Sequence, residues 1–94
     1  MSTEDTDNIS VILEVRGSRY GKFTIHAEIT QATKTIMCST SKWEHLDADQ
    51  REALEMIAHK IGRILNGDPN YADSWVDIAG YAKLVSDRLE GTVR

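Results

Sequence analysis

Apolar residues recur at helical spacing between Phe23 and Met37. The stripe falls at i, i+4, i+7 and i+11 and consists of Ile25, Ile29, Ala32 and Ile36. Several threonines in the same segment weaken the prediction, because β-branched residues lower helix propensity. The pattern still favours a helix, which ends at the Ser-Thr-Ser sequence of residues 39–41.

The clearest pattern predicts a helix over residues 49–66. Asp49 and Glu52 have the spacing of an acidic capping box at its start. Asn66 and Gly67 supply its C-terminal stop. Apolar residues at 3.6-residue spacing fall on one side of this helix, namely Leu54, Ile57, Ala58, Ile61, Ile64 and Leu65.

A last helix is predicted after the proline-containing turn. Asp73 or Ser74 serves as its N-cap, and Gly91 closes it. Because the connection to the preceding helix is short, the two helices are expected to pack as an antiparallel hairpin. The inner face of the last helix is predicted to hold Trp75, Ile78, Ala79, Ala82, Val85 and Leu89.

The N-terminal part of the chain has a weaker pattern. Residues 1–8 are acidic and polar and are expected to form a disordered tail. Residues 9–16 are rich in β-branched residues and fit either a short helix or a strand. The sequence therefore predicts a single all-α domain over residues 9–94, with three to four helices and a C-terminal antiparallel helical hairpin.

Composition narrows the classes of partner. The chain has 94 residues and a net charge of −4, which argues against general binding of duplex nucleic acid. A chain of this size builds only a modest core, so we expect a homo-oligomer, a dimer or higher. Cys38 is the only cysteine, no apolar run is long enough to span a membrane, and the acidic N-terminus is unlike a secretory signal. These features predict a cytoplasmic protein with no membrane partner.

One segment stands out from this acidic background. The sequence RGSRYGKF at residues 16–23 contains Arg16, Arg19 and Lys22 with no acid among them. One interpretation is a loop that holds an anion such as a phosphate, with Tyr20 beside it. The alternative is a connector, in which the two glycines make a turn and the aromatic residues anchor it to the core.

Residues of the hairpin extend this candidate site. Lys60 and Arg63 would clamp a phosphate, or would instead lie along the apolar surface and pair with Asp73 or Asp77. No nucleophile pattern, Walker A sequence or dinucleotide fingerprint is present, so no catalytic residue is assigned. The predicted ligand-binding set is Arg16, Arg19, Tyr20, Lys22, His26, Lys60, Arg63, Trp75 and Tyr81.

Two pairs of carboxylates suggest a metal site. Glu52 and Glu55 lie one turn apart on one helix, and Asp73 and Asp77 lie one turn apart on the next. Together they have the chemistry to hold Mg²⁺ and, through it, a triphosphate. The alternative is that these acids cap their helices and complement the helix dipole.

The run REALEMIAHKIGRILNGDPNYADSWVDIAGYAKLVSDRLE at residues 51–90 has a further implication. Together with RGSRYGKF and the following His26, it resembles a widespread family of small phage-encoded proteins, carried as a domain of unknown function and sometimes described as MazG-like. The resemblance covers roughly residues 12–90. It implies a helical phage or prophage protein in the host cytoplasm, with distant kinship to MazG-type all-α nucleotide pyrophosphohydrolases.

Those hydrolases bind Mg²⁺ with an E-x-x-E helix followed by an E-x-x-D helix. By this resemblance, Glu52 and Glu55 match the first motif, and Asp77 matches the last acid of the second. Ser74 stands where the glutamate of the second motif should be, and Asp73 is one residue away. The chain therefore departs from the hydrolase pattern at one ligand.

Three functions follow as hypotheses. The first is a phage protein that binds a phosphate-bearing, nucleotide-type small molecule and sequesters a host defence signal. The second is a Mg²⁺-dependent nucleoside triphosphate pyrophosphohydrolase. The third is an anti-defence protein that inhibits a host defence or replication protein by docking on it, with its acidic surface steering the encounter.

Overall fold

The computed structural model describes the backbone of residues 3–94 and the side chains of residues 8–94. This part of the chain is helical and contains no strand, which confirms the all-α prediction. The elements are α1 (Thr3–Tyr20), α2 (Phe23–Cys38), the short 3₁₀ helix η1 (Trp43–His45), α3 (Ala48–Asn66) and α4 (Ala72–Leu89).

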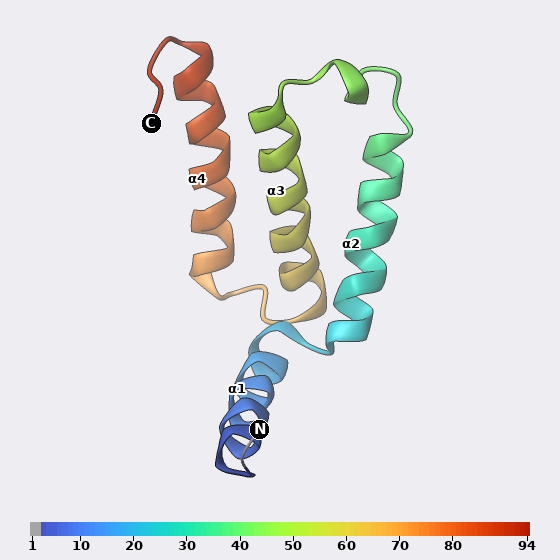
Figure 1. Cartoon of the computed structure of the whole chain (residues 1–94), viewed down its shortest axis with the longest axis vertical. Helices are drawn as coiled ribbons and strands as arrows, with labels where there is room; N and C mark the ends of the chain where they lie inside the picture. Colours follow the sequence, from blue (N-terminus) through green and yellow to red (C-terminus); the bar gives the residue numbers. More distant parts are fainter. Residues whose placement is uncertain (1–2) are drawn as a thin grey trace.

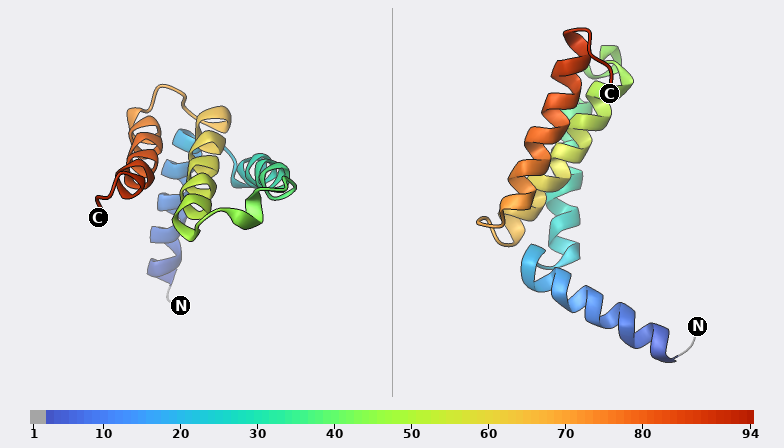
Figure 2. Two further views of the ribbon diagram at one scale, coloured as in Figure 1. Left: turned by 90° about the horizontal axis from the view of Figure 1, so that it is seen from above. Right: turned by 90° about the vertical axis from the view of Figure 1, so that its left-hand side faces the viewer.

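Three of the helices form one layer. α2, α3 and α4 lie side by side with α3 in the centre, and α1 projects from one end of the layer (Figures 1 and 2). The predicted antiparallel hairpin is confirmed as the close pair of α3 and α4. The radius of gyration is 16.2 Å, whereas a compact domain of this length has about 12 Å. The described chain is therefore extended rather than closed around a core.

The N-terminal segment differs from its prediction in two respects. Residues 9–16, which fitted a helix or a strand, are helical. α1 also runs through most of the predicted tail 1–8, because it begins at Thr3, and residues 1 and 2 lie outside the described residues. The prediction of a loop over 16–23 is wrong, since α1 continues to Tyr20. A glycine with positive φ, Gly21 (φ 79°), is enough to end the helix.

The helix caps were also assigned to the wrong residues. The capping box of α3 uses Asp47 and Gln50 instead of Asp49 and Glu52, and the Gln50 side chain accepts a hydrogen bond from the Asp47 N–H at 2.9 Å. α4 begins after Tyr71, which provides no side-chain cap, so the prediction of Asp73 or Ser74 as N-cap is wrong. The stop of α3 at Gly67 is confirmed.

α3 packs against neighbours on two opposite sides through small or paired residues. Gly62 lets α2 approach closely, because a Cβ there would lie 2.9 Å from His26 Nδ1 and from Thr30 Oγ1. On the other side, the buried Lys60 pairs with Asp77 of α4 at 3.1 Å. Among the described residues, only Ala53 and Ala58 are buried apolar side chains.

The large apolar residues of the layer are therefore not its core. Leu54 and Ile61 of α3 are exposed, and Leu65 retains 69% of its accessible surface. On α4, Trp75 retains 55%. The predicted inner faces are therefore correct only in part for a single chain: Ala58 is buried and Ile57 and Val85 are half-buried. Leu54 and Trp75 stay exposed because each helix contacts its neighbour about a quarter turn away from the centre of its apolar stripe. No helix within residues 3–94 is long and apolar enough to cross a membrane.

Candidate anion-binding site

The link between α1 and α2 is held against the end of α3. Asn66 donates its side-chain amide to the carbonyl oxygens of Tyr20 (3.0 Å) and Lys22 (2.8 Å). The Asp68 N–H donates to the Arg19 carbonyl at 2.8 Å. A Cβ on Gly21 would collide with the Asn66 carbonyl. The last residues of α1 and the first of α2 are therefore fixed relative to α3.

Four side chains stack at this junction. Arg63 lies over the Tyr20 ring, 4.6 Å from its centroid. Tyr20 meets Tyr71 edge-on with centroids 6.2 Å apart, and Arg19 lies 4.3 Å from the Tyr71 centroid. The Tyr71 hydroxyl donates to Asp73 at 2.8 Å, and this hydrogen bond raises the pKa of Tyr71. The stack ties α1 to both helices of the hairpin.

A pocket of about 510 Å³ opens beside this stack, and we call it the cationic pocket. Its wall contains Arg16, Lys22 and Arg63 and no acidic residue. None of these three cations forms an ion pair with a side chain of residues 8–94. The full lining is Leu13, Arg16, Gly17, Tyr20, Gly21, Lys22, Phe23, Thr24, His26 and Arg63.

The histidine in this wall belongs to a stacked pair. The rings of His26 and His59 lie 5.7 Å apart, and Phe23 stacks on the outer side of His26 at 6.3 Å. His26 Nε2 is 3.3 Å from Thr30 Oγ1, and its buried Nδ1 has no hydrogen-bond partner among the described residues. Lys34 Nζ donates to His59 Nε2 at 3.1 Å.

The surroundings of the two rings favour their neutral forms. Burial lowers the pKa of His26, and the nearby guanidinium of Arg63 lowers it further. Burial also lowers the pKa of His59, assisted by the positive charges of Lys34, His26, Arg63 and Lys60. At neutral pH, the positive charge of the cationic pocket therefore comes from its arginines and lysine.

The structure brings together five of the nine predicted ligand residues. Arg16, Tyr20, Lys22, His26 and Arg63 all line the cationic pocket.

The other four lie elsewhere. Arg19 sits against Tyr71, and Lys60 pairs with Asp77. Trp75 donates its indole N–H to the Pro69 carbonyl at 2.9 Å, and Tyr81 lies on α4.

The predicted metal ligands do not meet within one chain. Asp77 is occupied by Lys60 at 3.1 Å, and Asp73 accepts the Tyr71 hydroxyl. Glu52 lines a different hollow, beside Asp49 and Arg88. Among the described residues, no three His, Cys, Asp or Glu side chains come close enough to hold a metal ion. The four carboxylates of a single chain therefore do not fit Mg²⁺ as a group.

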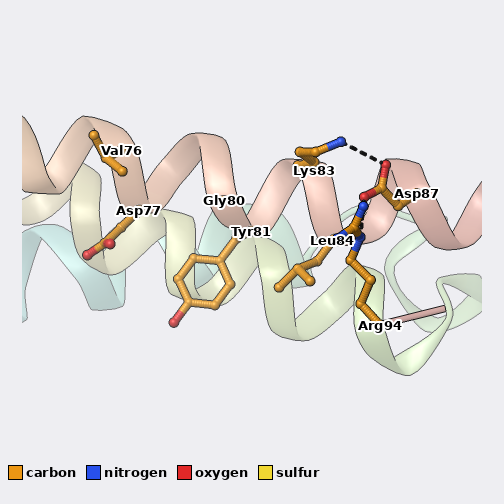
Figure 3. A pocket seen from close by; sticks show the side chains of 8 residues that line it. All are labelled: Val76, Asp77, Gly80, Tyr81, Lys83, Leu84, Asp87 and Arg94. Carbon is orange, nitrogen blue, oxygen red and sulfur yellow. Dashed lines mark hydrogen bonds and ion pairs between the residues drawn. The ribbon is translucent and has the colours of Figure 1, made fainter. Parts of the chain in front are cut away.

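A second hollow of about 550 Å³ lies along α4 and includes Tyr81 (Figure 3). Its buried acid, Asp87, accepts hydrogen bonds from Lys83 (3.1 Å) and Arg94 (2.8 Å). These bonds, chiefly the one from Lys83, lower the pKa of Asp87. The acids of this hollow are already paired, Asp87 with Lys83 and Arg94, and Asp77 with Lys60 outside the hollow, in contrast to the cations of the cationic pocket.

Sequence reasoning missed three residues of the junction. Asn66 was assigned only as a helix stop, although it pins the α1–α2 link. Tyr71 was not singled out, although the Asp-Pro-x-Tyr turn contains it. Phe23 was expected to anchor a turn to the core, but 78% of its surface is exposed and its ring lines the pocket. These roles depend on the tertiary contact between the α1–α2 link and α3, which local sequence patterns do not show.

Comparison with known proteins gives a family and no function. A search of curated proteins and a search of solved structures each found no match. A family model matches residues 6–89, which include the junction, the cationic pocket and the hairpin. The chain therefore belongs to the family described as domain of unknown function DUF6378.

Proposed function

We propose that the protein binds a phosphate-bearing, nucleotide-type small molecule in the cationic pocket. The observation that carries the proposal is the wall itself, in which Arg16, Lys22 and Arg63 have no paired carboxylate among the side chains of residues 8–94. Unpaired cations gathered in one concave site favour an anion with several oxygens. Guanidinium groups suit phosphate in particular, because their N–H donors match two of its oxygens at once.

Aromatic surface beside the cations supports a nucleotide rather than a bare phosphate. Phe23 presents an exposed ring at the rim, and Tyr20 forms part of the wall. A base stacked on such a ring contributes about 1–3 kcal/mol, whichever base it is. The volume of about 510 Å³ lies within the range of about 300–1,000 Å³ that is usual for small-molecule sites.

In this proposal the residues act by binding and orientation. Arg16 approaches the phosphates from α1, Lys22 approaches from the α1–α2 link, and Arg63 approaches from α3. Asn66 holds the link in place through its two backbone contacts. Neutral His26 offers its ring as part of the wall.

The resemblance to phage proteins suggests a use for such binding. A phage protein that holds a nucleotide without consuming it would sequester a host defence signal. Hydrolysis finds no support in one chain, because Asp77 is paired with Lys60 and no three of the acids among the described residues gather into a metal site.

Isothermal titration calorimetry tests the proposal. The ligands are nucleoside triphosphates, deoxynucleoside triphosphates, cyclic nucleotides and inorganic phosphate. We expect at least one nucleotide to bind more tightly than phosphate. We also expect Arg16→Ala to weaken that binding by roughly 10- to 150-fold, because a hydrogen bond to a charged group contributes about 1.5–3 kcal/mol.

Lys42→Ala is the matched control, because it removes an exposed cation near η1 that does not line the cationic pocket. It should leave the affinity unchanged. The proposal is wrong if no nucleotide binds at millimolar concentration, or if Arg16→Ala and Lys42→Ala behave alike. Release of pyrophosphate in the same mixtures, abolished by Glu55→Ala, would instead identify the hydrolase.

A further inference from the structure

One face of the three-helix layer is apolar and uncovered. On α3, Leu54, Ile57, Ile61 and Leu65 lie in a line, about a quarter turn from Gly62 on one side and Lys60 on the other. These two residues contact α2 and α4, so the line belongs to neither contact. A groove of about 330 Å³ between α3 and α4 continues this face and is lined by Leu46, Gln50, Ala53, Leu54, Ile57, Ala82, Val85, Ser86 and Leu89.

The stripes of the two outer helices lie on the same side of the layer. On α4, Trp75 and Ala82 lie about a quarter turn from the buried Ser74, and Ala82 shares the groove with Leu54. On α2, the stripe of Ile25, Ile29, Ala32 and Ile36 lies between a quarter and half a turn from the residues that touch α3. Because α2 runs antiparallel to α3, this angular offset places the apolar stripe of α2 on the same face of the layer as Leu54. We call the combined surface the open face.

A single layer with one apolar face is half of a usual domain. Stable domains bury such a face between two packed layers. Residues 3–94 provide no second layer, because α1 projects from the end of the first (Figure 2). The apolar side chains of the open face are therefore removed from solvent only if a further surface packs against them.

The exposed area sets a limit on how large that further surface is. The chain has an accessible surface of 6861 Å², whereas a compact monomer of this mass has about 5,500 Å². The excess is roughly 1,400 Å² per chain. A standard interface buries about 800 Å² per partner, and obligate homodimers bury more. α1 contributes part of this excess, because it projects from the layer and its Ile12, Leu13 and Val15 are exposed. The excess is therefore an upper limit on the area that the open face contributes to a homodimer interface.

We infer that the open face is a homodimer interface on which a second copy of this chain packs its own open face. A two-fold axis places the same patch on both subunits, so an apolar patch opposes an apolar patch without any charge to neutralise. The two layers then enclose one core that contains Leu54, Ile61 and Trp75 of both copies.

This interface is separate from the proposed ligand site. Arg63 lies on the side of α3 opposite Leu54, so the cationic pocket opens away from the open face. Dimer formation and nucleotide binding are therefore testable independently, and failure of one leaves the other standing.

Sedimentation velocity on the full chain tests the inference directly. We expect the wild-type protein to sediment with the mass of a dimer at every concentration in a dilution series from about 100 to about 1 µM, as for an obligate interface. A monomer across that whole range would overturn the inference, and would leave the open face to a different protein.

A double substitution then identifies the face. Leu54→Ala with Ile61→Ala should weaken the dimer by at least about tenfold, because both copies lose the same contacts. Alanine is the best helix former, and both residues are partly exposed in the single chain, so the variant is expected to remain helical by circular dichroism.

Val76→Ala is the matched control, because this exposed apolar residue lies on α4 away from the open face. It should dimerise like the wild type. A double variant that dimerises as tightly as Val76→Ala would show that another surface forms the dimer. Should the double variant unfold, Leu65→Cys in a Cys38→Ser background provides a second test by oxidative cross-linking. Absence of a cross-link from both Leu65→Cys and Trp75→Cys would overturn the assigned face.

Discussion

Replacement of Asn66 by alanine probes the junction on which the candidate site depends. The Asn66 amide donates two hydrogen bonds, to the Tyr20 carbonyl at 3.0 Å and to the Lys22 carbonyl at 2.8 Å. Each bond contributes about 1 kcal/mol of net stability. The higher helix propensity of alanine offsets at most about 0.7 kcal/mol of this loss, and it offsets less at the last residue of a helix. The free energy of unfolding should therefore fall by roughly 1–1.5 kcal/mol.

Urea unfolding followed by circular dichroism measures this loss. For a chain of this size, a loss of that magnitude lowers the midpoint by roughly 1 M with little change in slope. Protein concentration is held constant, because oligomerisation makes stability depend on it. Asn70→Ala is the control, since that side chain is exposed in the neighbouring turn, and it should change stability by less than about 0.5 kcal/mol. Equal midpoints for the two variants would refute the role assigned to Asn66.

Four further outcomes follow from the junction and the helices around it. Gly21→Ala should destabilise the fold by about 1–3 kcal/mol in thermal denaturation, because φ is 79° and a Cβ meets the Asn66 carbonyl. Gly17→Ala, at a position with open space in the last turn of α1, should instead stabilise it by up to about 1 kcal/mol. Lowered pKa values of His26 and His59 mean that the unfolded chain binds more protons below pH 6.5, so stability should fall as the pH drops from 7.5 to 5.5. Replacement of both histidines by glutamine should flatten that pH dependence, and an unchanged slope would contradict the assignment. Arg19→Ala should lower stability through the loss of its Tyr71 contact yet leave nucleotide affinity within about twofold of wild type, since Arg19 does not line the cationic pocket.

The positions of the helices could be predicted from local sequence signals. Periodic apolar residues, Gly67 after α3 and the proline-containing turn are all encoded within a few neighbouring residues. α1 was harder to predict, because Gly17 resembled a turn residue although a helix tolerates a glycine at modest cost. Its end depends on Gly21, whose positive φ is matched to the close approach of Asn66, forty-five positions further along the chain.

The candidate site could be predicted only in part. The cluster of cations in RGSRYGKF was visible because it contrasts with an acidic chain, and Arg16 and Lys22 do line the same pocket. Arg19 was included by proximity in sequence, but on a helix it points about 60° away from Arg16, since three residues span 300°. Arg63 joins the pocket through tertiary packing, and the pairing of Lys60 with Asp77 removes both from it.

The error about the core and the inferred dimer have the same physical origin. A periodic stripe predicts that a helix buries one side, but it does not say whether that side meets the same chain or another one. In this chain, Gly62, Lys60 and Ala58 make the contacts within the layer, because small or ion-paired residues allow helices to lie close on both flanks of α3. The large residues, such as Leu54 and Ile61, then extend from the layer at right angles to those contacts. Under the inferred dimer, the exposed apolar residues of the open face, such as Leu54 and Ile61, form a core between two chains. The stability of the protein should then rise with its concentration.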